Sequence, residues 1–461
     1  MIDILIDQFL VALLFGVVGA VLLSLIGLIS GTDETTTLAP LTMVVVLLDA
    51  PPAAVLTFFL AGAIAKHMTH AVPTALLGIP GDTMATPLMR EANYLRALGA
   101  PHLALRKMIA GGMISAFIAV PASVLFAVIL APFGDIIKPT APWIFVFAAV
   151  AIAWFSKGRL ASVVALIPFV MLILGLQSFT GSHDTKLNVS FFLGIAVGPL
   201  LVDFFMTLAP AERKLMLRES PRTTSLAPDV QEWKGFFPSP FKILDSTQLK
   251  WTSATALVSS ATFVFSPVAM TVILGEVVGS RVKHIYRRLT TVLSARNGVT
   301  ESTYIAEALI PLIAFGLPLS PVAAGPAAPL FNAPPRFSVS DATGQVNNLH
   351  SLLTSWEFLG YGMLSVVIAA MVAYPLTMRY SYQAALFVAK KISHEAVIAT
   401  FTALILIVGI WEGGVLGVFV ILTLGIFGGM LSRFLGVNVG VQFMGYYIAI
   451  LTVPAFLKLI G

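Results

Sequence analysis

The sequence predicts an all-α integral membrane protein built from two inverted-topology repeats. Three observations lead to this fold class: the composition, a helix break that occurs twice, and the placement of the basic residues. Of the 461 residues, 58% are hydrophobic and 11% are charged, whereas a soluble domain carries about 25% charged residues. The apolar runs are long and continuous, which favours spanning helices over the alternating pattern of a β-barrel. We expect about 10–12 membrane-embedded segments, including re-entrant helical hairpins.

The composition also excludes several classes of function. The chain has no cysteine, so disulfides, thiolate metal sites and thiol catalysis are excluded. The pI near 9.3 does not indicate a nucleic-acid partner, because the basic residues lie in short loops beside apolar spans that a lipid bilayer would surround. No P-loop, H-E-x-x-H motif or Ser/His/Asp spacing stands out. We therefore predict no enzyme activity and no cofactor.

A glycine–proline break interrupts two of the apolar segments. Residues 78–83 read Gly-Ile-Pro-Gly-Asp-Thr, and residues 316–320 read Gly-Leu-Pro-Leu-Ser. The two first glycines are 316 − 78 = 238 residues apart, and the preceding Pro73 and Pro311 are separated by the same 311 − 73 = 238. A single break would be an ordinary helix kink, but a matched pair favours two hairpin turns with a binding site at the broken ends.

The basic residues predict that the two halves have opposite orientations. The loop after the second break, 332–350, carries one basic residue, Arg336, whereas the loop after the first carries four: Arg90, Arg96, Arg106 and Lys107. Three further pairs of loops differ in the same way: 281–296 against 43–58, 379–391 against 132–142, and Lys157 with Arg159 against the segment of Glu412. Basic loops lie on the cytoplasmic side. The expected organisation is repeat 1 at 1–210, a basic cytoplasmic linker at 211–252 and inverted repeat 2 at 253–461, with both termini outside.

Several short motifs resemble the large membrane subunit of tripartite tricarboxylate transporters, the TctA permease family. Residues 75–83, Ala-Leu-Leu-Gly-Ile-Pro-Gly-Asp-Thr, followed by Arg-Ala-Leu-Gly at 96–99, are similar to the family's I-L-L-N-[IV]-P-G-T hairpin and R-A-L loop. In the second half, 298–302, 308–312 and 316–318 are similar to its G-V-A-x-P-E and A-L-I-P-L-x-x-x-G-I-P patterns. This chain departs from the family at the tips, where Gly78 replaces an asparagine and Leu319 replaces a glycine.

The resemblance implies a permease of the bacterial or archaeal cytoplasmic membrane, driven by an ion gradient. Its substrate would be a small organic carboxylate such as a di- or tricarboxylate, and its partners a small four-helix membrane subunit and a periplasmic solute-binding protein. The altered tips leave a second function open, namely a transporter or channel for a cationic or neutral small solute that works without a binding-protein partner. A homodimer is also left open as the assembly state.

The broken ends supply the candidate ligands. Backbone amides at half-helix ends favour an anion, and hydroxyls can bind substrate oxygens. The candidate substrate-binding residues are Gly31, Thr32, Thr35, Gly78, Pro80, Gly81, Thr83, Gly316, Pro318 and Ser320. A charged residue within the hydrocarbon layer costs at least about 2.5 kcal/mol unless it is compensated. We therefore assign the coupling ion, Na⁺ or H⁺, to four acids: Asp33, Glu34, Asp82 and Glu301.

Each of these acids also has a simpler interpretation. Asp33 and Glu34 could lie in an exposed loop between the runs 8–30 and 38–48, Asp82 could be a helix N-cap, and Glu301 could be a solvated helix-end charge. Nearby, Lys66, His67 and His70 could meet a carboxylate or titrate, and the histidine spacing fits a metal pair that lacks an evident third ligand. We interpret these three as residues at the cytoplasmic end of a helix, and Glu276 as a partner of Arg281 and Lys283.

Overall fold

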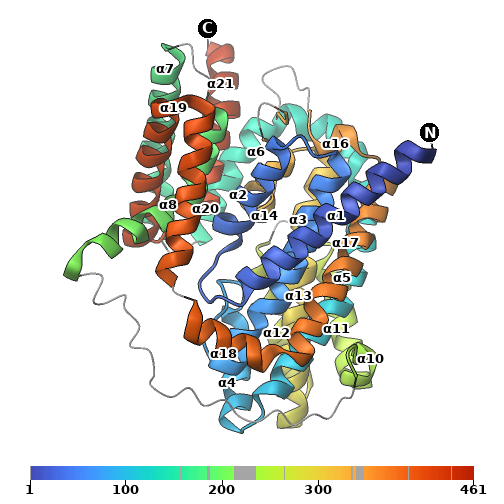
Figure 1. Cartoon of the computed structure of the whole chain (residues 1–461). Coiled ribbons are helices and arrows are strands. Elements are labelled where there is room, and N and C mark those ends of the chain that lie inside the picture. Colours follow the sequence, from blue (N-terminus) through green and yellow to red (C-terminus); the bar gives the residue numbers. More distant parts are fainter. Residues whose placement is uncertain are drawn as a thin grey trace.

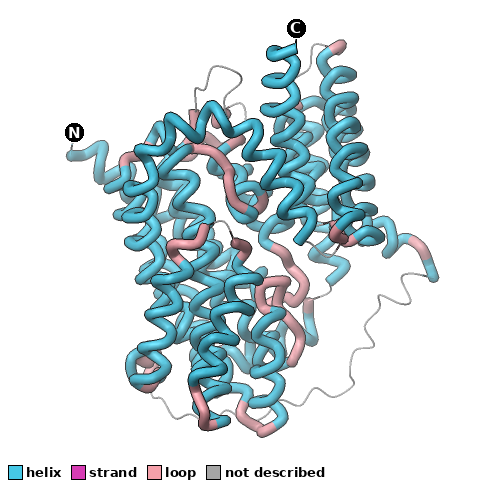
Figure 2. Tube along the Cα trace, turned by 180° about the vertical axis from the view of Figure 1, so that it is seen from behind, coloured by secondary structure: helices cyan, strands magenta, loops and turns pink. Residues whose placement is uncertain are grey.

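The computed structural model describes residues 2–155, 158–183, 187–211, 235–263, 265–333, 336–338, 347–392, 394–437 and 439–460. Within these ranges the chain is almost entirely helical (Figure 2), and its β pairings are two isolated bridges, Ala333 with Phe337 and Ser338 with Asn347. Eight helices of this part are long and apolar enough to cross a membrane, by length and composition. The predicted all-α membrane protein is confirmed. Lys157, residues 212–234 of the linker, and 334–335 and 339–346 of the loop 332–350 lie outside the described residues.

Proline begins two central helices of the first half. Pro52 and Pro101 stand at the start of α3 and α5, where the missing N–H would have no intrahelical partner anyway. A π-helical turn, η1 (Pro73–Leu77), extends α3 to the first break, and a 3₁₀ turn, η2 (Thr86–Leu88), follows it. The helices are α1 (Ile2–Gly27), α2 (Glu34–Leu47), α3 (Pro52–Val72), α4 (Met89–Ala97), α5 (Pro101–Leu130), α6 (Gly134–Phe155), α7 (Leu160–Gly181) and α8 (Asn188–Leu208).

Side-chain caps begin several helices of the second half. Asp245 closes a capping box with Gln248 on α11, Ser266 caps α12, and Thr354 closes a box with Glu357 on α17. The longer helices are α11 (Ser246–Ser259), α12 (Pro267–Arg281), α13 (Ile285–Phe315), α17 (Ser355–Arg379), α18 (Ser381–Lys391), α19 (His394–Leu435), α20 (Val439–Tyr447) and α21 (Val453–Ile460). Four-residue turns complete this half: α10 (Pro240–Ile243), α14 (Pro321–Ala324), α15 (Ala328–Phe331) and α16 (Leu349–Leu352).

The helices form two groups (Figure 1). Helices α6, α7, α8, α19, α20 and α21 gather on one side, and α1, α3, α5, α11, α12, α13 and α17 on the other. Helix α2 contacts α3 of the second group and α8 of the first, and α14 contacts both α13 and α20. Helices α3 and α13 are almost completely buried along their lengths. Polar side chains on these two helices are therefore enclosed by protein.

Helices of each half of the chain pack on helices of the other half. Helix α3 of the first half packs on α17 of the second, and α13 of the second packs on α5 of the first. In the same way α1 contacts α17, and α11 contacts α5. In Figure 1, α4 after the first break and α16 after the second lie at opposite ends of the molecule, and the N and C labels lie toward the end of α16. The membrane sidedness of these ends stays a prediction.

Three segments predicted as loops are helical. Arg106 and Lys107 lie in the second turn of α5 and are buried, where Lys107 donates to the Gln248 side-chain oxygen at 2.8 Å. Arg296 lies inside α13 and is also buried. The segment 379–391 contains all of α18, and its basic residues Arg379, Lys390 and Lys391 are exposed. The predicted spans ended too early at Arg106, Lys107 and Arg296, because these side chains are buried against other parts of the protein.

Both glycine–proline breaks end a helix in the same way. Gly78 has φ +70° and its N–H bonds the carbonyl of Pro73, while Gly316 has φ +68° and its N–H bonds the carbonyl of Pro311 at 3.0 Å. A left-handed residue ends a helix most readily when it is glycine, which has no Cβ to clash. The helix ends predicted at these two glycines are present in the structure.

A further break lies within α19. Gly413 and Gly414 have non-helical dihedral angles, and Gly409 and Gly417 pack against each other across the break. The neighbouring Glu412 carboxylate accepts the backbone N–H groups of Val189 and Ser190, at 2.8 and 2.6 Å, at the start of α8. The small residues Gly409 and Gly417 thus let the two arms of α19 approach closely beside this break.

Candidate ion and substrate site

The segment at the first glycine–proline break, residues 78–83, docks on the turn between α1 and α2, and we call it the first tip. The Ser30 hydroxyl donates to the carbonyl of Pro80 at 2.6 Å, and the Gly31 N–H donates to the carbonyl of Gly81 at 2.7 Å. The hydroxyl of Thr83 lies 3.3 Å from a carboxylate oxygen of Asp33. The turn between α1 and α2 and the first glycine–proline break, 50 residues apart in the chain, are therefore joined by hydrogen bonds. The sequence alone did not indicate this contact.

The threonine run at the start of α2 is satisfied mostly within itself. The Asp33 carboxylate caps α2 by accepting the Thr35 N–H at 2.9 Å, and the hydroxyls of Thr36 and Thr37 donate to the Asp33 carbonyl. The Thr32 hydroxyl donates to carbonyls at the end of α1, at 2.9 and 3.1 Å. The hydroxyl of Thr32 thus serves to close α1 in this conformation.

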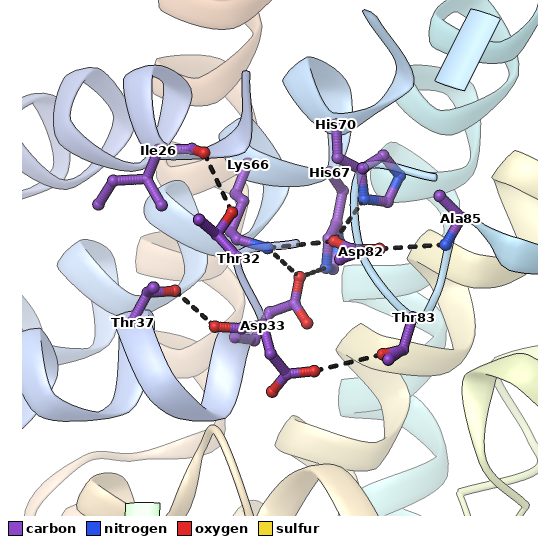
Figure 3. A network of polar contacts seen from close by, with 12 residues as sticks. Ile26, Thr32, Asp33, Thr37, Lys66, His67, His70, Asp82, Thr83 and Ala85 are labelled. Atoms are coloured by element: carbon purple, nitrogen blue, oxygen red, sulfur yellow. Dashed lines mark hydrogen bonds and ion pairs between the residues drawn. The ribbon is translucent and has the colours of Figure 1, made fainter. Parts of the chain in front are cut away.

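A buried lysine links the start of α2 to the first glycine–proline break (Figure 3). The ammonium of Lys66, on α3, lies 2.6 Å from Glu34 Oε1 and 3.1 Å from Asp82 Oδ2. All three side chains are at most 1% exposed. Glu34 belongs to α2 and Asp82 to the first tip, so one cation holds both segments against α3. Removing one member of such a buried pair leaves a charge without compensation.

Two histidines extend this cluster toward the second half. Nδ1 of His70 lies 2.7 Å from Asp82 Oδ2, and Nδ1 of His67 lies 3.2 Å from Oε2 of Glu301 on α13. The ring of Tyr304, one turn beyond Glu301, contacts the ring of His67 edge-on with centroids 4.6 Å apart. Glu301 is therefore a buried member of the cluster, and not a solvated helix end.

Some polar atoms of the cluster are left unsatisfied by the contacts described above. Among the described residues, Glu34 Oε2, Glu301 Oε1, His70 Nε2 and the Tyr304 hydroxyl are buried without a hydrogen-bond partner. One ligand atom each from Glu34, His70 and Asp82 lie within 4.8 Å of one another, a spacing that fits a cation. Lys66 already contacts two of these three groups. Buried polar atoms without partners are potential ligands for a further ion, a proton or a small polar molecule.

Acidic groups outnumber the fixed cation in this site. The cluster and its edge contain four carboxylates, those of Asp33, Glu34, Asp82 and Glu301, and one lysine. The histidines His67 and His70 add positive charge only when they are protonated. Uncompensated charge is costly in a buried site. The arrangement therefore favours uptake of a cation or a proton.

The segment at the second glycine–proline break, residues 316–323, which we call the second tip, is held by hydrogen bonds of its own. Gly316, Pro318 and Ser320 are buried, and the Ser320 hydroxyl donates to the Glu307 carbonyl at 2.7 Å while it accepts the Ala323 N–H at 3.0 Å. A Cβ on Gly325, just beyond this tip, would lie 3.5 Å from the Thr35 hydroxyl. Among the predicted ligands, Thr35 therefore lies beside the segment that follows the second tip.

The predicted ligands of the first tip differ in exposure. Gly31 and Thr83 are exposed, and Asp33, Gly78 and Pro80 are half-buried. Buried behind them are Thr32, Glu34, Thr35, Gly81 and Asp82. The exposed and half-buried residues together form the edge at which the Thr83–Asp33 contact closes. We call this edge the tip rim: Gly31, Asp33, Gly78, Pro80 and Thr83.

Lys66, His67 and His70 are at most 1% exposed and lie in the last turns of α3, and the membrane side of that helix end stays a prediction. One sequence interpretation is wrong. Glu276 pairs with Arg296 at 2.7 Å, and not with the basic residues that follow it in sequence. The acids Asp33, Glu34 and Asp82 were found because they interrupt apolar runs. Lys66, His67 and His70 were not included among the predicted site residues, because their partners come from other segments of the chain.

Replacing Gly81 with alanine is expected to lower the free energy of unfolding by about 1–3 kcal/mol, as overpacking does. A Cβ at Gly81 would lie 2.7 Å from Cβ and 2.9 Å from Cα of His70, which the backbone of α3 fixes. The tip would have to move and break its bonds to Gly31 and Thr74. Denaturant titration in detergent measures the effect. Gly175→Ala, where nothing lies within 4 Å of the added carbon, is the control and is expected to cost nothing; equal effects of the two would contradict the packing described.

A comparison with family models matches residues 13–440 to the tripartite tricarboxylate transporter TctA family. Neither the curated proteins nor the solved structures that were compared gave a match. The matched range contains both helix breaks, the tip rim and every member of the buried cluster. The chain therefore belongs to the tripartite tricarboxylate transporter TctA family, and is a membrane protein of a transporter family.

Proposed function

We propose that the chain is an ion-coupled secondary active transporter for a small organic carboxylate, such as a di- or tricarboxylate. Membership of a tricarboxylate transporter family supports the substrate class. The observation that carries the proposal is the buried Lys66, held between acids of two separate broken segments. A buried ionic cluster at broken helices is costly unless it serves binding, and transporters place their sites at such breaks near the membrane midplane.

The tip rim is the proposed point of entry. A carboxylate that arrives there meets the Thr83 hydroxyl and the exposed backbone of Gly31. Opening of the Thr83–Asp33 contact, which spans 3.3 Å, would give it access to the Lys66 ammonium. The substrate carboxylate would then compete with Glu34 and Asp82 for that ammonium. Binding of an anion in this way needs the displaced acids to be neutralised.

That need is the proposed origin of ion coupling. When the substrate takes the Lys66 ammonium, Glu34 and Asp82 lose part of their compensation and gain affinity for a cation. Na⁺ or H⁺ would bind among Asp33, Glu34, Asp82 and Glu301, where unpaired atoms are potential ligands. The coupling free energy is reciprocal, so the cation also raises the affinity for the carboxylate. Substrate and ion would then cross together.

The architecture supports two inverted repeats. Each half has a long helix that ends at a left-handed glycine, and each packs its own helices on those of the other half. Opposed hairpins of this kind suit movement of a hairpin-bearing unit against the remaining helices.

In this proposal the chain lies in the cytoplasmic membrane of a bacterium or archaeon, with both termini outside. It would work with a small four-helix membrane subunit and a periplasmic solute-binding protein, as the tripartite family implies.

One observation favours a second candidate function. Asp33 is a half-buried acid on the tip rim, and the site holds more acids than fixed cations. Such a rim suits a cationic solute, which would need no binding-protein partner to collect it. In that case Asp33 would bind the solute directly, rather than the coupling ion.

Uptake into proteoliposomes distinguishes the two candidates. The purified chain is reconstituted and supplied with labelled citrate, labelled succinate or labelled choline under an imposed Na⁺ or pH gradient. We expect gradient-driven accumulation of a carboxylate, and none of choline. Asp33→Asn is expected to reduce the dependence on the ion gradient, whereas Asp49→Asn, an 89% exposed carboxylate that pairs with Arg336 outside the cluster, is the control. Accumulation of choline alone would establish the second candidate and refute the first.

A further inference from the structure

Glu307 is a buried acid that the Lys66 cluster does not use. It lies on α13, nine residues before Gly316, and its side chain is 0% exposed. Its Oε2 accepts the Val322 N–H at 3.0 Å, and its Oε1 has no hydrogen-bond partner among the described residues. The carboxyl group thus touches the backbone of the second tip, at Val322.

The main chain of Glu307 is bound to the same tip. Pro311 has no N–H, so the carbonyl of residue 307, four positions earlier, lacks its helical partner. The Ser320 hydroxyl supplies the missing hydrogen bond at 2.7 Å. Side chain and carbonyl of Glu307 together therefore hold residues 320–322 against α13. The second tip, 316–323, is closed on this one residue.

Glu307 differs from the other buried acids because no cation compensates it. Glu34, Asp82 and Glu301 each have a basic partner within 3.2 Å, whereas no described basic side chain pairs with Glu307. Residues 317–333, which include α14 and α15, contain no ionisable side chain. On the other elements around this part of α13, His67 of α3 pairs with Glu301, His350 of α16 bonds the carbonyl of Ile313, and α20 carries the tyrosines Tyr446 and Tyr447.

An ionised carboxylate in such surroundings is strongly disfavoured, since burial penalises the charged form and one backbone N–H offsets only part of the penalty. The protonated form fits the contacts: one oxygen accepts from Val322, and the other carries the proton. Once the tip separates from α13, water can solvate the carboxylate and the proton can leave. The protonation of Glu307 and the position of the tip are then linked.

We propose that Glu307 is a proton-binding residue of the second hairpin, protonated while the tip 316–323 is packed on α13 and deprotonated when the tip opens to water. The step moves one proton between Oε1 of Glu307 and water, and breaks the hydrogen bond from Val322. This inference rests on the proposed function, because it names the proton as an ion whose binding controls the second hairpin. The two helix breaks then differ in kind: the first is closed by an ionic cluster, and the second by a neutral acid.

The infrared C=O stretch of a protonated carboxylic acid tests the inference without any transported solute. We expect wild-type protein in detergent at about pH 8 to show this band, and Glu307→Gln to lack it. Glu276→Gln, which changes a 64% exposed carboxylate that pairs with Arg296, should keep the band. Its absence from the wild type, or its presence in a folded Glu307→Gln variant, would overturn the inference.

A second variant keeps the test decisive if Glu307→Gln does not fold. Ser320→Ala removes the hydroxyl that closes the tip on the Glu307 carbonyl, so the band should disappear at a lower pH than in the wild type. An unchanged pH dependence of the band would contradict the link between the proton and the tip.

Labelled citrate uptake then separates the two proposals. If the band behaves as expected but no carboxylate is accumulated, the proposed function fails and the proton site stands; if the band is absent, the proton site fails whatever the transport shows.

Discussion

Lys66→Met is expected to lower the free energy of unfolding by about 3–5 kcal/mol, the cost of breaking a buried ion pair. Methionine fills a similar volume, but it leaves Glu34 and Asp82 facing each other without the ammonium that lies 2.6 and 3.1 Å from them. Both acids are buried, so water cannot replace the lost charge. Denaturant titration of the purified protein in detergent measures the difference. Carboxylate transport should be lost in the same variant, because the cation that attracts the substrate is gone.

Two further variants show whether charge causes this loss. The triple variant Lys66→Met, Glu34→Gln, Asp82→Asn removes the cation together with the two acids it compensates, and should recover most of the stability but not the transport. Lys283→Met changes an exposed lysine and should leave stability within about 0.5 kcal/mol of the wild type. If Lys66→Met were as harmless as Lys283→Met, the buried cluster would not exist as described.

Arg296→Met is the second change with a large expected effect, again about 3–5 kcal/mol. The guanidinium donates to Glu91 at 2.5 Å, to the Pro87 carbonyl at 2.7 Å and to Glu276 at 2.7 Å. Residues 87 and 91 follow the first glycine–proline break, and residue 276 lies on α12. One arginine of the second half therefore holds the segment that follows the first break. Its loss should also expose that segment to proteolysis, which a time course with trypsin would detect.

The two acids around Arg296 provide an internal comparison. Glu91 is 10% exposed and Glu276 is 64% exposed at the side chain. Glu91→Gln should destabilise the protein more than Glu276→Gln, since water already screens the exposed pair. Arg296→Lys keeps the charge but cannot reproduce the planar fork, and should recover only part of the loss. Full recovery by lysine would contradict the role assigned to the three separate acceptors.

The sequence predicted the features that depend on local chemistry. Gly78 and Gly316 end their helices because glycine adopts positive φ without strain, and a constant spacing from Pro73 and Pro311 marks both. Asp82 was singled out because it is an acid at the break; one of its oxygens accepts the Ala85 N–H at 3.0 Å in the turn before η2, the other contacts Lys66, and its role as a ligand stays a prediction. Local signals of this kind are readable from one segment at a time.

Features that depend on distant segments could not be predicted in this way. Lys66 is separated from its partners Glu34 and Asp82 by 32 and 16 residues, and His67 from Glu301 by 234. The first half of α13 was missed as an apolar segment because its arginines, threonines and Glu301 lower its hydropathy. Protein rather than lipid surrounds this helix, and neighbouring helices satisfy its polar groups. A buried charged residue with a remote partner therefore looks like a solvent-exposed one in sequence.

Gradient-driven uptake of labelled citrate into proteoliposomes is the most direct test of the central claim, that the buried cluster around Lys66 couples carboxylate entry to an ion gradient. The wild-type chain should accumulate citrate above the external concentration when an inward Na⁺ or pH gradient is imposed, and should stop when the gradient is collapsed by an ionophore. The triple variant that removes the cluster should show no accumulation. Equilibration without accumulation, or accumulation that the triple variant retains, would contradict the account.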